Sequence, residues 1–291
     1  MVDVKKYQKL ISAKTDAMLE KVLPTSDTYP VSIHTLMRYS TFAGGKRIRP
    51  CLLMAAFEAC GGKNVDEENA LLTASAIEML HTFSLIHDDL PCMDDDDFRR
   101  GKPTAHKAFN EALAVLGGDA LCIAAFEILA TTGRIDVVKD IAGALGTNGM
   151  LGGQVVDIES EGKQVSKETV EYIHRKKTAA LIRASIRAGA IIAGADLASI
   201  DKLTQFGELI GLAFQVVDDI LDEESTTEQL GKDAGSDREN GKATYPSVFG
   251  MNESKKYARE LIETACKEIE FLGEKGETLG KLAEYIITRI S

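Results

Sequence analysis

The sequence lacks the features that mark secreted and membrane proteins. Its five cysteines are scattered, odd in number and without a CxxC pair, which is typical of reduced thiols. The segment Met1 to Leu10 has no apolar core of a signal peptide, so no secretory signal is expected. Uninterrupted apolar stretches such as Ala188 to Ala195 are far shorter than the roughly 20 residues that span a bilayer. These absences predict a cytoplasmic protein with no membrane span.

An excess of positive charge is also lacking. Lysine and arginine number 34 against 45 aspartates and glutamates, which gives a net charge of −11 at pH 7. Such an acidic protein is poorly suited to binding nucleic acid, so no nucleic-acid partner is expected. It can hold a phosphorylated substrate only where basic side chains reverse the field locally.

Proline is missing from a long central region. All six prolines lie outside the stretch from Thr104 to Tyr245, which is rich in helix-forming residues. Apolar residues recur there at the i, i+3, i+4, i+7 spacing of a helix face. The clearest run is Leu203, Phe206, Leu209, Ile210, Ala213, Phe214 and Val217. The pattern favours an all-α protein.

Turn signals divide this helical pattern. Helix starts are expected at Asp66–Glu68 and at Ser166, and a break is expected near Gly117. Alternating period-2 runs are scarce, and composition does not shift along the chain. We therefore predict one domain over residues 1–291, a single large helical bundle of roughly ten helices.

Two acidic clusters end apolar helices. The first, LIHDDLPCMDDDD, contains Asp88, Asp89 and Asp94, and the second is FQVVDDILD. The second spaces its polar residues at i, i+3, i+4 and i+7, so they form one stripe: Gln215, Asp218, Asp219 and Asp222. Like charges at this spacing destabilise a bare helix, and a bound cation reverses that effect. Carboxylate oxygens favour Mg²⁺ or Ca²⁺, whereas the simpler alternative is a pair of solvated acidic helix ends.

Basic residues flank both clusters. They occur in GGKRIRP near the N-terminus, in Arg99–Arg100, in Lys176–Lys177–Thr178 and in the GKD that contains Lys232. Arginine presents a planar fork to phosphate, and lysine presents a mobile point charge. The two glycines before Lys46 let backbone N–H groups approach an anion. Together the motifs indicate two diphosphate sites, one held through metal and one held directly by arginine and lysine.

In order along the chain, GGKRIRP, LIHDDLPCMDDDDFRRGKPTAH, KKTAAL, FQVVDDILD and GKD resemble the motifs of the trans-isoprenyl diphosphate synthases. The resemblance runs from about Arg38 to Pro246 and is closest to the short-chain bacterial farnesyl synthases. It implies the isoprenoid synthase fold, with helices around a deep central cavity, and a homodimer. It also implies a cluster of about three Mg²⁺ ions, with Mn²⁺ as a possible substitute.

The resemblance assigns roles residue by residue. It implies that six aspartates are metal ligands: Asp88, Asp89, Asp94, Asp218, Asp219 and Asp222. It implies an isopentenyl diphosphate site of Gly45, Lys46, Arg49, His81 and Arg100. It implies an allylic diphosphate site of Arg99, Lys177, Thr178, Gln215 and Lys232, of which Arg99, Lys177 and Lys232 also assist catalysis by offsetting charge. Gln154 and Asp157 fit a polar cavity wall.

The implied reaction joins isopentenyl diphosphate to dimethylallyl or geranyl diphosphate through an allylic cation, giving farnesyl diphosphate and pyrophosphate. Product length is expected to depend on Phe83, with the small Ser84 beside it. Phe83 lies five residues before the first motif, about 7.5 Å back along the helix axis. Farnesyl synthases of the bacterial type carry an aromatic residue there.

Three other functions stay open. The chain could be a geranylgeranyl diphosphate synthase of the same fold. The dipeptide His87–Asp88 also occurs in HD-type metal phosphohydrolases, which need further histidine ligands. A non-catalytic partner subunit of the same fold should have lost one aspartate motif, and both are present here.

Overall fold

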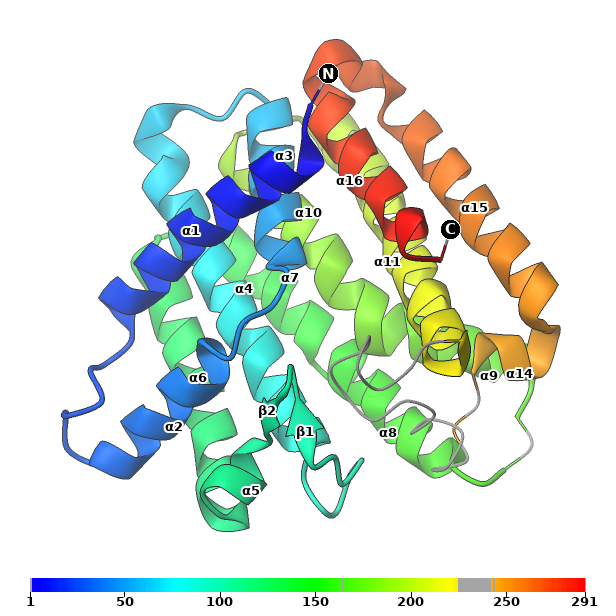
Figure 1. Cartoon of the computed structure of the whole chain (residues 1–291). Helices are drawn as coiled ribbons and strands as arrows, with labels where there is room; N and C mark the ends of the chain where they lie inside the picture. The colour runs from blue at the N-terminus through cyan, green and yellow to red at the C-terminus, as the bar shows by residue number, and fades with distance from the viewer. Residues whose placement is uncertain (1, 164, 225–241, 243, 291) are drawn as a thin grey trace.

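The structure is a computed structural model that describes residues 2–163, 165–224, 242 and 244–290. The described residues are helical almost throughout, which confirms the all-α class (Figure 1). The N-terminal half contains α1 (Val4–Val22), α2 (Val31–Thr41), α3 (Ile48–Ala59), η1 (Asn64–Asp66), α4 (Glu67–Asp88), β1 (Phe98–Arg99), β2 (Lys102–Pro103), α5 (Ala105–Ala108), α6 (Glu111–Thr131) and α7 (Ile135–Leu145). The C-terminal half contains α8 (Met150–Ser160), α9 (Lys167–Ile173), η2 (His174–Ala179), α10 (Ala180–Ile192), α11 (Leu197–Glu224), α14 (Tyr245–Phe249), α15 (Met251–Glu268), η3 (Glu270–Gly276), α16 (Glu277–Ile287) and η4 (Thr288–Ile290).

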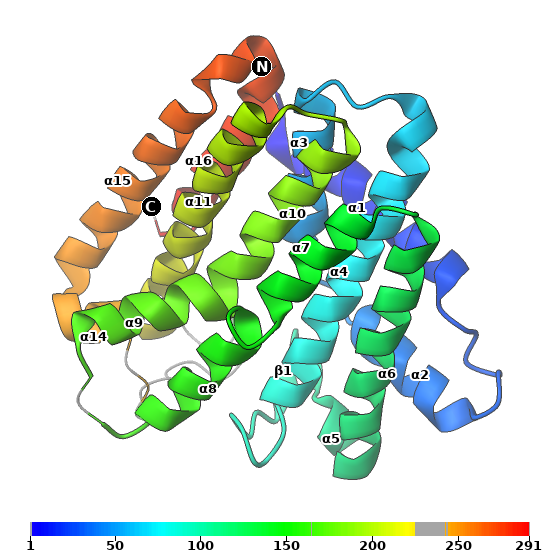
Figure 2. The same ribbon diagram turned by 180° about the vertical axis from the view of Figure 1, so that it is seen from behind.

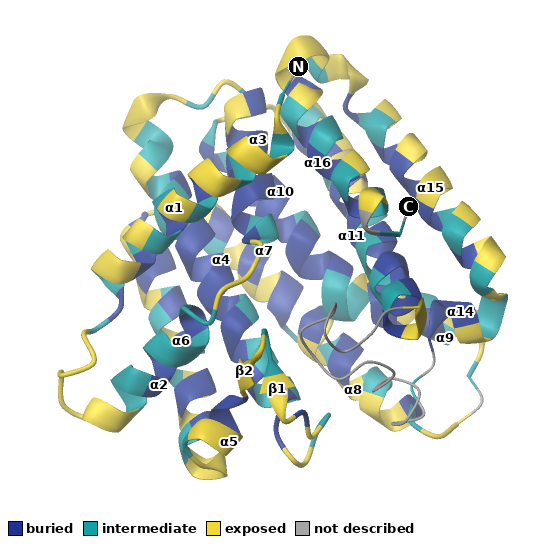
Figure 3. Cartoon of the chain, viewed as in Figure 1, coloured by how far each residue is buried: buried dark blue, intermediate teal, exposed yellow. Residues whose placement is uncertain are grey.

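The centre of the bundle is built from helices that are apolar on nearly every side. In α3 every residue from Pro50 to Phe57 is buried, and α10 is buried along most of its length. A helix that is hydrophobic all round needs neighbours all round, and α10 packs between α3 and α11 while α4 packs against α3 and α6. Figure 2 shows the same bundle from behind, and Figure 3 shows α10 as largely buried, with α1 and α15 outside.

The helical periodicity of the sequence is confirmed in α11. Of the seven residues in the predicted run, Leu209 and Phe214 are half-buried and the other five are buried: Leu203, Phe206, Ile210, Ala213 and Val217. The expected helix starts are confirmed too. Helix α4 begins at Glu67, and the Ser166 hydroxyl accepts a hydrogen bond from the Thr169 N–H at 3.3 Å to cap α9.

The break expected near Gly117 is wrong, because Gly117 and Gly118 lie inside α6. They are glycines for reasons of packing. A Cβ on Gly117 would lie 2.3 Å from the Leu36 side chain, and one on Gly118 would lie 2.3 Å from His87 Nε2. The glycines therefore let α2 and α4 approach α6 closely. The number of helices was also underestimated, since short ones such as α5 and α14 are included.

Helix α6 is the one described helix that is long and apolar enough to cross a membrane by length and composition alone. Glu111, Asp119 and Glu127 interrupt its apolar residues, so the sequence shows no uninterrupted apolar run there. In the fold it packs against α2 and α4. Because the core helix of a soluble protein meets the same criterion, α6 is weak support for a membrane span.

Candidate active site

One cavity of about 600 Å³ opens among α4, the β1–β2 hairpin, α8, η2 and α11. It brings together residues that are far apart in the sequence, including most of those singled out from the motifs. The predicted residues that line it are Arg49, His81, Phe83, Ser84, Asp88, Asp94, Arg99, Arg100, Gln154, Lys177, Thr178, Gln215 and Asp218. The expected central cavity is therefore present, and its wall carries both acidic and basic groups.

In the first acidic motif, the two adjacent aspartates face different surroundings. Asp88 ends α4 and lines the cavity, and the chain folds back so that the Asp94 N–H donates to the Asp88 carbonyl at 2.8 Å. Asp89 is buried and accepts from Arg99 Nε at 2.9 Å. Burial raises the pKa of Asp89 to about 6, partly offset by Arg99, and burial also raises the pKa of Asp88. Asp88 and Asp94, but not Asp89, line the cavity.

The hairpin after this motif separates two adjacent arginines. Its two-residue turn, Arg100–Gly101, has φ values of 55° and 74°, as a tight antiparallel hairpin requires. Arg99 turns back to the acidic motif and donates to Asp96 Oδ2 at 2.8 Å. Arg100 instead donates to the Gly44 carbonyl, on the GGKR loop. The turn thus sends one arginine toward each predicted diphosphate site.

The second acidic motif is divided in the same way. Asp218 lines the cavity, whereas Asp219 is buried against the scaffold. Asp219 accepts from Gln215 Nε2 at 2.8 Å and from the Tyr245 N–H at 2.7 Å, and His174 Nε2 lies 3.1 Å away. Burial alone would raise the pKa of Asp219, but these partners, His174 first, lower it. Asp222 is buried as well and is not part of the cavity wall.

Lys177 stands in η2, a single π-helical turn of the kind often found at functional sites. Its Nζ lies 2.7 Å from Asp157 Oδ2. Burial alone would lower the pKa of Lys177, but Asp88 and Asp157 raise it, so the lysine is fully charged. The neighbouring Thr178 hydroxyl donates to Gln215 Oε1 at 2.6 Å, which ties η2 to α11.

Sequence reasoning missed Lys242. Its Nζ lies 2.8 Å from Asp94 Oδ1, and it lines the cavity beside Lys177. Burial alone would raise the pKa of Asp94, but Lys177 and Lys242 lower it. The only sequence signal is a lone lysine in GKATYP. Lys232 lies outside the described residues.

The predicted isopentenyl diphosphate residues differ in whether they reach the cavity. Arg49, His81 and Arg100 line it, whereas Lys46 is exposed and is not part of the lining. Burial, with Arg49 and Arg100 next, holds the pKa of His81 well below its usual range, so the ring is neutral. Glycine suits position 45 because its φ of 130° would strain other residues, and a Cβ there would also lie 2.8 Å from Arg100 Cζ and displace that guanidinium.

The remaining wall is partly polar and partly apolar. Gln154 lines the cavity, and Asp157 lines a small adjoining hollow with Lys177. Phe83 is buried, lines the cavity and meets the His87 ring edge-on at a centroid distance of 5.5 Å. Ser84 donates to the His81 carbonyl at 2.9 Å. Met150, Leu151 and Phe214 complete an apolar part of the wall.

The acidic residues fit a divalent cation that a substrate completes. In residues 2–163, 165–224, 242 and 244–290, no three His, Cys, Asp or Glu side chains come together closely enough to hold an ion on their own. Asp88, Asp94 and Asp218 nevertheless line one cavity with oxygen donors. Mg²⁺ is usually held by one or two carboxylates together with substrate phosphates. The donor set therefore suits Mg²⁺ bound with a diphosphate.

The geometry argues against an HD-type hydrolase. His87 Nε2 lies 3.0 Å from the Val115 carbonyl, and because a carbonyl can only accept, this nitrogen is the donor. Only Nδ1 of His87 would then remain to ligate a metal. No described residue supplies a histidine cluster around Asp88.

Comparison with known proteins agrees with this site. Residues 30–279 match the family described as polyprenyl synthetase. A chloroplastic geranylgeranyl pyrophosphate synthase of Capsicum annuum is 49% identical over 89% of this chain and 72% of its own length. A solved putative farnesyl-diphosphate synthase of Marinomonas sp. MED121 is 38% identical with a TM-score of 0.83, covering 99% of this chain and 100% of the other. A geranyltransferase of Helicobacter pylori, solved with magnesium and isoprenyl diphosphate, is 29% identical with a TM-score of 0.84, covering 100% of this chain and 98% of its own.

Proposed function

The chain belongs to the polyprenyl synthetase family of prenyltransferases, and from that premise we propose that it condenses isopentenyl diphosphate with dimethylallyl or geranyl diphosphate to give farnesyl diphosphate and pyrophosphate. One observation carries the proposal. A single cavity holds cavity-facing carboxylates from both acidic motifs, two groups of basic side chains and an apolar wall. These are the three surfaces needed for two diphosphates and a prenyl tail.

The allylic diphosphate lies on the side of Asp88, Asp94 and Asp218 in this proposal. Bound Mg²⁺ would supply neutralisation of the charge on the departing pyrophosphate there. Lys177, Arg99 and Lys242 add fixed positive charge at the same place, and their burial strengthens the interaction because little water screens it. Magnesium together with isoprenyl diphosphate in the Helicobacter pylori relative supports this use of the site.

Isopentenyl diphosphate lies on the side of Arg49, Arg100 and His81. The two arginines offer donors for a diphosphate, while neutral His81 adds a hydrogen-bonding group without changing the charge. The tail of the growing product extends along the apolar wall near Phe83. The cavity walls limit the access of bulk water to the allylic cation, which would otherwise react with water to give an alcohol.

Geranylgeranyl diphosphate is the second candidate product. It is favoured by the 49% identical relative from Capsicum annuum, which is described as a geranylgeranyl pyrophosphate synthase. Buried Phe83 on the apolar wall favours the shorter farnesyl product. The experiment is to incubate purified protein with Mg²⁺, labelled isopentenyl diphosphate and dimethylallyl or geranyl diphosphate, and to separate the products by length. A fifteen-carbon product supports the proposal, a twenty-carbon product selects the alternative, and absence of condensation refutes both.

We also propose a homodimer. Helix α6 exposes Leu116 at 54% and Ile123 at 70%, which leaves an apolar strip on the surface of a single chain. Burial of this strip against a second copy would remove it from water. Light scattering after size-exclusion chromatography should give twice the chain mass, and Ile123→Glu should shift the protein toward monomer. A wild-type monomer at micromolar concentration would contradict the proposal.

A further inference from the structure

The loop that precedes α3 has a backbone that needs external support. Gly44 and Gly45 have φ values of 96° and 130°, and Arg47 has φ = 46° although it is not glycine. A residue with a β-carbon stays in this left-handed region only where its surroundings hold it there. The support therefore has to come from contacts that Arg47 and its neighbours make with other elements.

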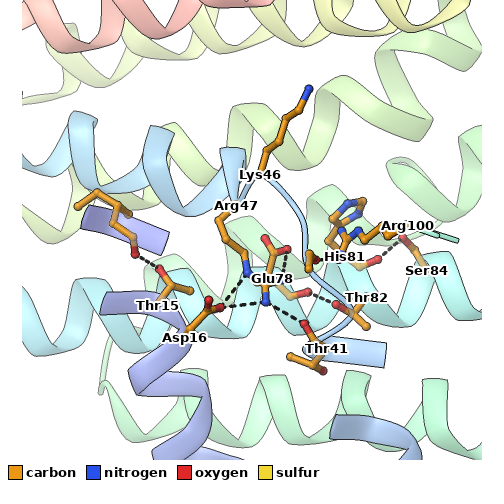
Figure 4. A network of polar contacts seen from close by, with 12 residues as sticks. Thr15, Asp16, Thr41, Lys46, Arg47, Glu78, His81, Thr82, Ser84 and Arg100 are labelled. Atoms are coloured by element: carbon orange, nitrogen blue, oxygen red, sulfur yellow. Dashed lines mark hydrogen bonds and ion pairs between the residues drawn. The ribbon is translucent and has the colours of Figure 1, made fainter. Parts of the chain in front are cut away.

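Arg47 makes those contacts with three helices. Its Nε donates to Asp16 Oδ1 of α1 at 3.0 Å, its Nη1 to Glu78 Oε1 of α4 at 2.9 Å, and its Nη2 to the Thr41 carbonyl at the end of α2 at 2.8 Å. Arg47 is 4% exposed and Glu78 is 2% exposed. Figure 4 shows Arg47 pointing into this network while Lys46 extends the opposite way. Each nitrogen of the buried guanidinium has a protein partner, and Arg47 does not line the cavity.

This loop and the first turn of α3 carry Lys46 and Arg49, two of the residues assigned to isopentenyl diphosphate. Lys46 directly precedes Arg47 and is exposed, and Arg49 lies one residue beyond Ile48 and lines the cavity. Two further contacts hold the loop: Gln8 Nε2 donates to the Lys46 carbonyl at 2.6 Å, and Arg100 donates to the Gly44 carbonyl. A displacement of Arg47 would therefore move Lys46 and Arg49 together.

We infer that Arg47 is a positioning residue for isopentenyl diphosphate: through Asp16, Glu78 and the Thr41 carbonyl it fixes the loop and the first turn of α3, whose Lys46 and Arg49 bind the diphosphate, without touching the substrate itself. Glu78 has a second part in this arrangement. Its charge acts on Arg49 and Arg100 as well as on Arg47, so one buried carboxylate offsets several arginines that would otherwise repel one another. The inference rests on the proposed function, because it concerns one of that reaction's substrates.

The test compares Arg47→Lys and Asp16→Asn with a matched control, Arg187→Gln. Arg187 is also engaged by a carboxylate and a hydroxyl, with Nε to Asp140 Oδ2 at 2.9 Å and Nη1 to Thr204 at 2.5 Å, but it does not line the cavity. Each protein is assayed for the KM of isopentenyl diphosphate, the KM of geranyl diphosphate and the thermal midpoint. If Arg47→Lys does not fold, Asp16→Asn still tests the inference. This variant should fold, because the Asp16 side chain is 46% exposed.

Arg47→Lys should raise the KM of isopentenyl diphosphate at least about tenfold, as expected for the loss of one charge-assisted contact, with the KM of geranyl diphosphate unchanged. Asp16→Asn should shift the same constant by a smaller factor, and Arg187→Gln should lower only the thermal midpoint. Lys46→Ala combined with Arg47→Lys should show less than the product of the single effects, since both act on one contact. Equal rises in both KM values, or an unchanged KM for isopentenyl diphosphate, would overturn the inference. Failure of the wild-type protein to condense the substrates would instead overturn the proposed function.

Discussion

Adjacent aspartates in each acidic motif have different neighbours, and the difference leads to different expected roles. Asp88 and Asp218 line the cavity, whereas Asp89 pairs with Arg99 and Asp219 contacts His174, Gln215 and the Tyr245 backbone. The motif spacing predicts that these carboxylates lie near one another. It does not predict which one of each pair faces inward, because that depends on partners from other elements.

Substitution of a cavity-facing aspartate should remove most activity. Asp88→Asn or Asp218→Asn should lower turnover by at least about 10²-fold, the loss typical of one electrostatic transition-state stabiliser. The fold should hardly change, because a neutral side chain relieves repulsion among neighbouring carboxylates. Asp97→Asn is the control, since exposed Asp97 pairs with Lys107 at 2.7 Å outside the cavity. Turnover at saturating Mg²⁺ is the measurement, and near-normal rates in both variants would refute the metal-site assignment.

His81 should make stability depend on pH. In the folded protein the pKa of His81 lies well below its usual range, whereas the unfolded chain titrates near 6.5. The unfolded state therefore binds more protons below pH 6.5, and the free energy of unfolding should fall there by up to about 1.4 kcal/mol per pH unit from this group. His81→Gln should remove this contribution. Urea unfolding at pH 7, 6 and 5 measures it, and parallel pH dependences for the two proteins would rule it out.

Among the elements, local signals could be read from the sequence and packing signals could not. The start of α9 could be predicted, because the Ser166 hydroxyl caps its own helix by accepting from the Thr169 N–H. The continuity of α6 through Gly117 could not be predicted, because this glycine makes room for the side chain of Leu36, which is distant in the sequence. Lys242 was missed for the same reason. Its place in the site depends on the ion pair with Asp94, which is distant in the sequence, rather than on the residues next to it in the chain.

The close contact between α4 and α6 can be tested with two glycines. Gly118→Ala places a Cβ 2.3 Å from His87 Nε2, so it should destabilise the protein by about 1–3 kcal/mol, as overpacking usually does. Gly143→Ala in α7 meets no atom within 4 Å and should stabilise it by about 0.4–1 kcal/mol, since alanine restricts the unfolded chain. Urea unfolding compares the two. Equal effects of the two substitutions would show that α6 does not need glycine against His87.

Across the whole molecule, the helical periodicity predicted the all-α class, and the motifs predicted the collection of the site residues around one cavity, but neither predicted the shape of that cavity. Most of its polar lining comes from motif residues, which the sequence displays directly, whereas Lys242 and Gln154 lie outside the motifs. Its apolar lining includes Phe83 of α4, Met150 and Leu151 of α8, and Phe214 of α11. No single motif contains that surface, so the length of the product is a property of the assembled bundle.

Phe83→Ala should therefore lengthen the product. Phe83 is buried on the apolar wall, and removal of its ring would extend the space available to the growing tail beyond fifteen carbons. The substitution should also cost about 3–5 kcal/mol of stability, as is usual for a buried phenylalanine.

Phe57→Ala provides the control, because Phe57 is 3% exposed in α3 and does not line the cavity. It should lose comparable stability with no change in product. Chromatography of the labelled products decides the matter: unchanged chain lengths in folded Phe83→Ala protein would remove Phe83 as the determinant, whereas longer products in this variant alone would assign the limit to that ring.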